Sequence, residues 1–534
     1  MAKKATTIKM EEALWDSANK LRGTVESSEY KHVVLALIFL KFTSDKFEAR
    51  KEELIAEGKD KYLEMKEFYN MKNVFFLAPE SRWSYIIANA KQDDIALKID
   101  TALHNVEKNN ESLKGALPDN YFSRLNLDPS KLSALLDTIN NIDTHTDKES
   151  DIVGRIYEFF LGRFAAAEGK GGGEFYTPKC IVNLLAEMLE PYKGKIYDPA
   201  CGSGGMFVQS IKFVENHNGN KKDISIYGQE YTATTYKLAK MNMAIRGIAG
   251  NFGDVPADTF FKDQHPDLKA DYIMANPPFN QSQWREKNEL EDDPRWAGFP
   301  TPPTGNANYA WIMHMLSKLS ETGTAGFVLA NGSMSSNTSG EGEIRQKMID
   351  NDQVDCMIAL PGQLFFTTQI PVCLWFMTKN KKENTEAGYR NREGETLFID
   401  ARNMGTMMDR THKELTKDDI SKIADTYHNW RSSASVTQSK RGLEEEVHGV
   451  LPENEGEVYQ DQPGYSKSAT LAEIQKNDYV LTPGRYVGVA EEEDDGIPFE
   501  TKMTELTETL FAQMAESENL DKAIRENLKT LGYE

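Results

Sequence analysis

Hydrophobic side chains in the first part of the chain recur at helical spacing. One face is formed by Met10, Leu14, Ala18 and Leu21, and an apolar stretch follows at 31–42. Apolar residues three and four positions apart lie on one side of an α-helix. Two further helices are expected at 93–109 and 129–139, and no β-rich segment separates them. We therefore expect an all-α N-terminal domain over residues 1–150.

From about residue 150, short apolar runs alternate with helical segments. The runs expected to form strands are 195–197, 224–227, 272–275, 325–330, 354–359 and 371–377. The segments expected to form helices are 152–164, 180–189, 206–215, 232–246, 309–320 and 343–350. Alternating strands and helices predict a parallel sheet with helices on both faces. We therefore expect an α/β domain at 151–430, a doubly wound, Rossmann-like sheet with an antiparallel final strand.

The last part of the chain, 431–534, is expected to be a linker followed by a C-terminal helical docking region. Residues 432–458 are polar, and the acidic run 491–495 is typical of a solvated loop. A heptad-like apolar stripe follows, formed by Phe499, Met503, Leu506, Leu510, Leu520, Ile524, Leu528 and Leu531. This stripe suits a helix that docks on a partner chain, or equally one that folds back on its own protein.

Composition narrows the class of protein. The net charge of −21 argues against a broad basic surface by which this chain alone could grip nucleic acid. The longest uninterrupted apolar run, 33–40, is too short for a membrane helix, and the N-terminus does not resemble a secretory signal. The four cysteines form no CxxC pair, so neither a disulfide framework nor a metal site is expected. These features indicate a cytoplasmic protein without a membrane partner.

The tetrapeptide Asn276-Pro277-Pro278-Phe279 carries the most specific chemistry. It follows an apolar run, so it lies at the carboxyl end of a predicted strand, where open α/β sheets place ligands. The Asn276 carboxamide oxygen and the Pro277 carbonyl can accept hydrogen bonds from an exocyclic amine, and Phe279 can stack on its heterocycle. Taken alone, the same tetrapeptide is also typical of a turn that ends a strand.

A glycine-rich turn spans 198–205 between a predicted strand and a helix, where glycines let a ligand approach the backbone. Glu230, at the end of the next strand, can accept both hydroxyls of a ribose. A dehydrogenase also uses this arrangement, although Asn-Pro-Pro-Phe has no role in hydride transfer. Upstream, Thr177 is expected to be the N-cap of a helix and Pro178 its first residue.

In their order along the chain, Phe175-Tyr176, the turn at 198–205, Glu230 and the tetrapeptide resemble S-adenosylmethionine-dependent methyltransferases that modify exocyclic amines of DNA bases. Further segments resemble the modification subunit of type I restriction–modification systems, namely 13–50, 266–280, 306–313, 360–371 and 467–489. This resemblance implies an adenine-specific DNA methyltransferase that protects host DNA from cleavage. The alternatives are a cytosine amino-methyltransferase, a protein-glutamine methyltransferase, or a catalytically silent scaffold subunit.

The resemblance also implies a role for each matching residue. The S-adenosylmethionine site would be lined by Glu174, Phe175, Tyr176, Thr177, Pro178, Lys179, Asp198, Gly202, Ser203, Gly204, Gly205, Glu230 and Asp258. Asp254 competes with Asp258 for the adenine of the cofactor. Asn276, Pro277, Pro278 and Phe279 would hold the amine of a flipped base, and Phe365 or Phe366 would stack on its other face.

The implied partners are DNA, a specificity subunit and a restriction subunit, with two modification subunits for each specificity subunit. In this family the DNA sequence is recognised mainly by the specificity chain. That division of labour accounts for the acidic charge of this chain.

Overall fold

The computed structural model describes Trp15, residues 27–141, Phe159 and residues 177–365, 369–433, 459–489 and 499–530. The chain forms two compact units, Met1–Gly488 and Val489–Glu534. In the described residues, no helix is both long enough and apolar enough to cross a bilayer. The predicted features that lie outside the described residues are the face at 10–21, most of the helix at 152–164, Glu174 to Tyr176, Phe366, most of 432–458, and 491–495.

The N-terminal part of the first unit is helical, as predicted. Its α-helices are α2 (Ser27–Ala56), α3 (Glu67–Asn70), α4 (Trp83–Ala88), α5 (Ile95–Asn109), α6 (Tyr121–Arg124) and α7 (Pro129–Asn140). Helix α2 includes the predicted segment 31–42 and continues through the charged stretch that follows it. Phe47 and Leu54 are fully buried on this continuation, while Arg50 donates to Glu53 and Glu57, so the helix keeps both an apolar side and paired charges.

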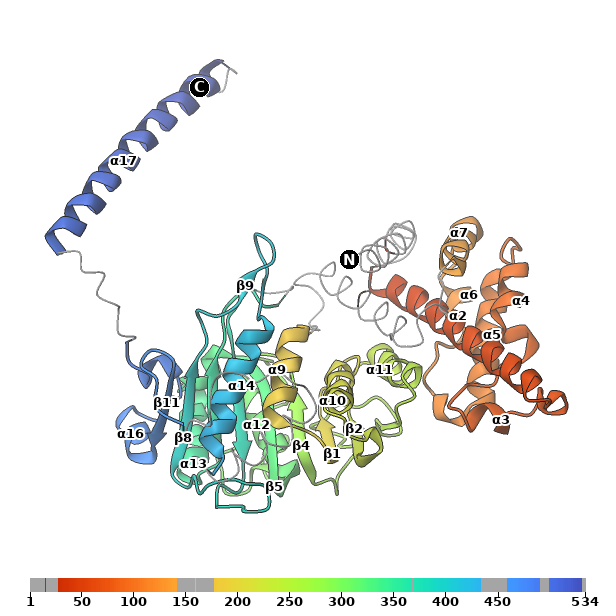
Figure 1. Ribbon diagram of the computed structural model, residues 1–534, viewed down its shortest axis with the longest axis horizontal. Coiled ribbons are helices and arrows are strands. Elements are labelled where there is room, and N and C mark those ends of the chain that lie inside the picture. Colours follow the sequence, from red (N-terminus) through yellow and green to blue (C-terminus); the bar gives the residue numbers. More distant parts are fainter. Residues whose placement is uncertain are drawn as a thin grey trace. The chain divides into compact units, whose positions relative to one another are not determined.

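The rest of the first unit is built on a nine-stranded sheet of order β11-β8-β6-β7-β5-β4-β1-β2-β3 (Figure 1). The strands are β1 (Gly194–Asp198), β2 (Ile224–Gly228), β3 (Gly250–Asn251), β4 (Ala270–Ala275), β5 (Leu319–Ala330), β6 (Val354–Ala359), β7 (Val372–Thr378), β8 (Glu395–Asp400) and β11 (Ser466–Thr470). Strand β7 runs antiparallel to both β5 and β6, which confirms the predicted antiparallel hairpin. The predicted fold class is therefore confirmed.

Helices cover both faces of the sheet. They are α9 (Lys179–Leu189), α10 (Gly205–Asn216), α11 (Ala233–Ile245), α12 (Asn308–Lys318), α13 (Glu341–Asp350), α14 (Lys417–Arg431) and α16 (Leu471–Lys476). One face is buried under α9, α10 and α14, and the other under α12, α13 and α16. Helix α11 packs on the sheet through Tyr236 and Met243, and on the N-terminal helices through Leu238 and Met241.

The sheet extends beyond the predicted strands. Strand β8 was not predicted, and β11, from the region assigned to C-terminal docking, pairs antiparallel with it. The expected region 431–534 is thus divided, because its residues 466–476 complete the sheet domain. The edge strand β11 is short and mostly polar, so its sequence carries little strand signal until β8 provides a hydrogen-bonding partner.

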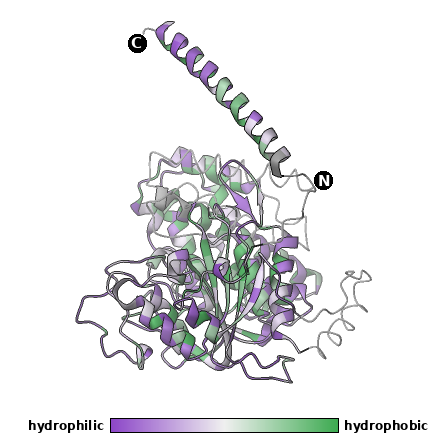
Figure 2. Cartoon of the chain, turned by 90° about the vertical axis from the view of Figure 1, so that its left-hand side faces the viewer, coloured by the Kyte–Doolittle hydropathy of each residue, from purple (hydrophilic) through white to green (hydrophobic). Residues whose placement is uncertain are grey.

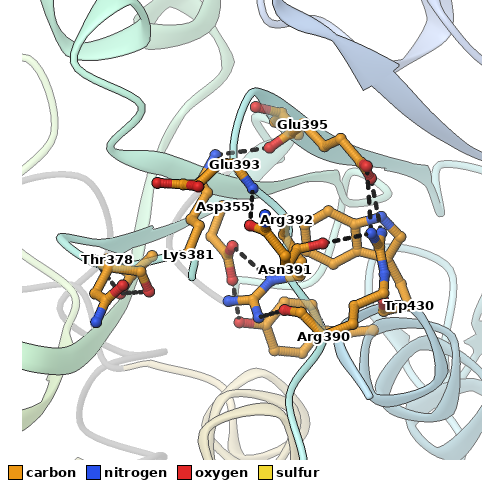
Figure 3. Close-up of polar contacts among 12 residues, drawn as sticks. Asp355, Thr378, Lys381, Arg390, Asn391, Arg392, Glu393, Glu395 and Trp430 are labelled. Atoms are coloured by element: carbon orange, nitrogen blue, oxygen red, sulfur yellow. Dashed lines mark hydrogen bonds and ion pairs between the residues drawn. The ribbon is translucent and has the colours of Figure 1, made fainter. Parts of the chain in front are cut away.

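A buried network of charges holds β8 against β6 (Figure 3). Asp355 accepts a hydrogen bond from Tyr427 Oη at 2.7 Å, and its Oδ1 lies 3.3 Å from Arg392 Nε. Lys381 Nζ donates to Asp352 at 2.7 Å and to the Glu395 carbonyl at 2.6 Å. Burial opposes the charge on Asp355, but Arg392 and Lys381 hold its pKa below the ordinary value. Buried charges paired in this way stabilise one arrangement of the edge strands.

The second unit contains one long helix, α17 (Phe499–Thr530). Its exposed apolar side chains are Met503, Leu506, Leu510, Phe511, Met514, Leu520, Ile524 and Leu528. Figure 2 shows apolar positions on this helix interspersed with polar ones, whereas strands such as β6 and β7 are buried along their whole length. The predicted stripe from Met503 to Leu528 therefore lies on a single continuous helix, whereas Leu531 lies outside the described residues.

Candidate active site

Three of the predicted site residues meet at the carboxyl edge of three adjacent parallel strands. Asp198 ends β1, Glu230 follows β2, and Asn276 follows β4. Strand β1 lies between β2 and β4. The strands that follow β1 in the chain are therefore added on one side of it at β2 and on the other side at β4. Ligands of doubly wound sheets bind at such a switch point.

Asp198 is a buried carboxylate at the centre of this edge. It is 1% exposed, and its Oδ1 accepts a hydrogen bond from the Ala200 N–H at 2.9 Å. Burial raises the pKa of Asp198 to about 8, and the nearby charge of Glu230 acts in the same direction. Within the part of the chain that the structure describes, no cationic side chain forms a salt bridge with Asp198. A buried acid in this state suits a ligand that brings its own positive charge.

The glycine turn after Asp198 leaves space in front of its backbone. Gly202 (φ +54°) and Gly204 (φ +81°) adopt left-handed conformations that favour glycine. A Cβ atom added at Gly202 or Gly205 would meet nothing within 4 Å, so these two glycines border open space. Helix α11 stabilises the turn, since Asn242 Nδ2 donates to the Ser203 carbonyl at 2.7 Å.

The backbone fixes the orientation of the Glu230 carboxylate. Its Oε2 accepts from the Gly202 N–H at 3.0 Å, and its Oε1 accepts from the Thr232 N–H at 2.8 Å. These two hydrogen bonds fix the plane of the carboxylate, and each oxygen of a carboxylate can accept more than one hydrogen bond. The next residue, Tyr231, is 72% exposed, and sequence reasoning did not select it.

Asn276 is hydrogen-bonded to the segment just before α9. Its Nδ2 donates to Thr177 Oγ1 at 2.9 Å, although the two residues are 99 positions apart. Since the amide nitrogen faces Thr177, the carbonyl end of the carboxamide points the other way. The prediction that Thr177 is the N-cap was wrong: Pro178 occupies that position, without a side-chain cap, and Lys179 begins the helix. The Thr177 hydroxyl is engaged by Asn276.

Two asparagines hold the loop that follows the tetrapeptide. The Asn280 N–H donates to Asn308 Oδ1 at 3.0 Å, and Asn308 Nδ2 donates to Asn280 Oδ1 at 2.9 Å. Asn280 has a φ of +51°, and Asn308 is 1% exposed at the start of α12. Sequence reasoning assigned these two asparagines no role. These two reciprocal hydrogen bonds fix the backbone directly after Phe279.

The aromatic side chains of the site form a pair of their own. The rings of Phe279 and Phe365 lie 5.9 Å apart at an angle of 78°, an edge-to-face contact. Phe365 is 3% exposed, so most of its surface already packs in the core. Phe279 is half-buried. The expectation that Phe365 stacks on a base therefore needs a movement of its side chain.

Of the two candidate acids near the cofactor adenine, Asp258 is tied into the site. Its Oδ1 accepts from the Phe260 N–H at 2.7 Å, and the neighbouring Thr259 hydroxyl donates to the Pro199 carbonyl at 2.6 Å, next to Asp198. Asp254 is exposed in the preceding loop. The contacts favour Asp258 over Asp254.

Arg295 connects the long loop after the tetrapeptide to this acid-bearing loop. Its guanidinium donates to both Asp293 oxygens at 2.8 and 2.7 Å, and to the Thr259 and Phe260 carbonyls at 3.1 and 2.5 Å. It also lies 3.3 Å from Nδ1 of the fully buried His314. Sequence reasoning did not identify Arg295, because the two carbonyls and His314 that it contacts are distant along the chain.

The protonation state of His314 follows from its neighbours. Arginine only donates, so His314 Nδ1 accepts, and a neutral ring then carries its proton on Nε2, 3.0 Å from Tyr197 Oη. Burial, together with the charge of Arg295, lowers the pKa of His314 to about 3, in agreement with a neutral ring. The network thus reaches from Arg295 to the residue before Asp198.

Two sequence families match this chain. The family described as N-6 DNA Methylase matches residues 148–495, and the family described as HsdM N-terminal domain matches residues 10–139. The methylase subunit of the type I restriction enzyme HindI from Haemophilus influenzae is 50% identical over 452 residues, covering 83% of this chain and 94% of that protein. The MjaIX methylase subunit from Methanocaldococcus jannaschii is 38% identical over 547 residues, covering 99% of this chain and 92% of that protein.

A solved structure has a similar fold. The methyltransferase subunit of a type I restriction–modification system from Streptococcus thermophilus superposes with a TM-score of 0.69 at 22% identity. The superposition covers 90% of this chain and 99% of that one, so the similarity extends over both the helical and the sheet parts.

Proposed function

This chain belongs to the N-6 DNA methylase family and, within it, to the methylase subunits of type I restriction enzymes; on that premise we propose how its residues act. It is a site-specific DNA methyltransferase that modifies the exocyclic amine of adenine. The N-6 amine belongs to adenine, which favours this function over cytosine modification, and the similarity to methylase subunits favours it over a silent scaffold. The observation that carries the mechanism is the Asn276–Thr177 bond beside two oriented carboxylates.

S-adenosylmethionine fits the residues at this edge. Asp198 would take the ammonium group at the amino-acid end of the cofactor, because it is a buried carboxylate paired with no cation of the described chain. Glu230 would accept both ribose hydroxyls, and Asp258 would lie by the adenine. The open side of Gly202 and Gly205 would border the cofactor. When bound, S-adenosylmethionine supplies an electrophilic methyl group to the amine nitrogen.

Asn276 and Pro277 would hold the amine of the flipped adenine. The Asn276 carbonyl end, turned away from Thr177, and the Pro277 carbonyl each accept one amine hydrogen. Two acceptors draw the nitrogen lone pair out of conjugation with the purine and direct it at the methyl group. Since the acceptors are fixed before the base arrives, little reorganisation is needed. Phe279 supplies the stacking face, and Pro278 keeps the loop stiff.

The test compares Asn276→Ala with Asn70→Ala, an exposed asparagine of the N-terminal helices. We expect Asn276→Ala to bind S-adenosylmethionine about as tightly as the wild type in calorimetry but to lose transfer of labelled methyl to DNA. Asn70→Ala should retain both properties. Substantial residual transfer by Asn276→Ala would contradict the proposed role of the carboxamide.

We propose further that the chain acts in a complex with DNA, a specificity subunit and a restriction subunit, with two modification subunits for each specificity subunit. The apolar stripe of α17 is a candidate surface for the specificity chain, since its side chains are exposed along one long helix. Removal of 498–534 should weaken co-purification with that chain. The paired change Leu510→Ser and Ile524→Ser should do the same, and Glu508→Ser should not. Unchanged co-purification of the truncated chain would count against this surface.

A further inference from the structure

A hairpin projects from the same edge of the sheet as the candidate active site. It consists of β9 (Thr406–Met407) and β10 (Lys413–Glu414), and it follows the carboxyl end of β8, which runs parallel to β6. Figure 1 shows it rising beyond the sheet at the end where α9 begins. Because parallel strands share one carboxyl edge, the hairpin lies on the side from which DNA must approach Asn276.

The base of this hairpin is rigid. Leu415 is 3% exposed in the core beneath α9 and α14, and Met404 packs against the same core. The Lys413 N–H donates to the Gln363 carbonyl at 2.9 Å. Gln363 lies two residues before Phe365, whose ring contacts Phe279. The hairpin is therefore fastened to the loop that completes the aromatic side of the base site.

The tip, in contrast, presents apolar side chains to solvent. Met407 is 45% exposed and Met408 is 61% exposed. Asp409 shapes the turn, since its Oδ1 accepts from the Thr411 N–H at 2.7 Å and the His412 N–H at 2.8 Å. Its carboxylate is thereby engaged with the backbone. Arg410 is an exposed cation of the tip, two positions after Met408 in the sequence.

We propose that this hairpin contacts duplex DNA beside the flipped adenine, with Met407 and Met408 against the gap in the base stack and Arg410 at a phosphate. This inference rests on the proposed function, because an adenine that swings out leaves such a gap. Apolar side chains, methionine included, fill gaps between base steps in bent or kinked duplexes. Methionine is flexible and polarisable, so it adapts to different neighbouring bases, as a subunit that leaves base recognition to another chain requires.

The test uses the assembled complex with its specificity subunit and the double variant Met407→Ser and Met408→Ser. Met71→Ser serves as the control, since Met71 is 80% exposed in the N-terminal helical part. Methyl transfer is measured in single turnovers on two duplexes, one fully paired and one with an abasic site opposite the target adenine. The abasic partner removes the pairing that otherwise opposes flipping.

We expect the double variant to methylate the paired duplex roughly tenfold more slowly, the scale of losing part of a base-stacking contact. On the abasic duplex it should match the wild type, and Met71→Ser should match it on both. Equal rates on the paired duplex would overturn the proposal. Equal slowing on both duplexes would also overturn it, because the hairpin would then act on the catalytic site rather than on flipping.

Three further measurements test the hairpin and distinguish its failure from a failure of the proposed function. Arg410→Gln should reduce the slope of log affinity against log salt by about 0.9, the value for one phosphate contact. Loss of the specificity subunit from the double variant during purification would assign the hairpin to a protein interface and overturn the proposal. A wild-type complex that methylates neither duplex would instead contradict the proposed function, and fluorescence of 2-aminopurine at the target position would still report whether the hairpin affects flipping.

Discussion

Asp198 is buried, and burial raises its pKa. We therefore predict that this residue, which is proposed to bind the cofactor, makes the folded protein less stable at high pH. Its pKa is about 8 in the folded protein, against an ordinary value of 3.8. The folded state therefore binds this proton more tightly than the unfolded chain does. Stability from this group is fully present below about pH 4 and is lost as the pH rises through about pH 8.

The size of the effect follows from these two values. Between about pH 5 and pH 8, this one group should lower the free energy of unfolding by roughly 3–4 kcal/mol. Asp198→Asn replaces the acid by a neutral side chain whose oxygen can still accept from the Ala200 N–H. Its new buried N–H donors cost about 1–3 kcal/mol, but at every pH alike. The diagnostic quantity is thus the pH dependence and not the absolute stability.

The assay is thermal unfolding without cofactor, followed by tryptophan fluorescence across this pH range. The Tm of Asp198→Asn minus that of the wild type should rise with pH by roughly 5 °C. Asp223→Asn, an exposed acid at the opposite edge of the sheet, should show no such trend. At pH 8, Asp198→Asn should also bind S-adenosylmethionine more weakly. A Tm difference that stays constant with pH would refute the assignment of a buried, uncompensated acid.

Two other contacts give predictions of different kinds. Thr177→Val removes the oxygen that orients Asn276, so the single-turnover methylation rate should fall about tenfold while calorimetric cofactor affinity is unchanged; an unchanged rate would refute the orienting role. Arg295→Lys cannot reproduce the four hydrogen bonds to Asp293 and two carbonyls, so KM for S-adenosylmethionine should rise several-fold while kcat stays nearly constant; this rise corresponds to a loss of roughly 1 kcal/mol of binding free energy. A fall in kcat alone would indicate that Arg295 affects the position of the target amine and not the binding of the cofactor.

Much of the fold was predictable because it depends on short-range patterns. Apolar periodicity identified the strands from β1 to β7, apart from the two-residue β3, and the helices between them. Strand β8, Glu395–Asp400, was missed, although it is apolar over most of its length and pairs with β6, which was predicted. Its place depends on the buried charges around Asp355, which come from three separate segments. Contacts between distant segments produce no regular spacing of residue types, so sequence analysis cannot detect them.

The sequence by itself determined the chemistry at the carboxyl edge of the sheet. A glycine turn, an acid after the second strand and Asn276 before two prolines are local features, since strand ends and turns require particular residue types nearby. Only the tertiary structure decided how these groups are oriented. Thr177 fits a helix cap when judged from its neighbours alone, yet the folded chain brings it to Asn276, 99 residues away. Likewise, burial of Asp198 and the partners of Arg295 arise from packing between distant segments, which hydrophobic patterning does not specify.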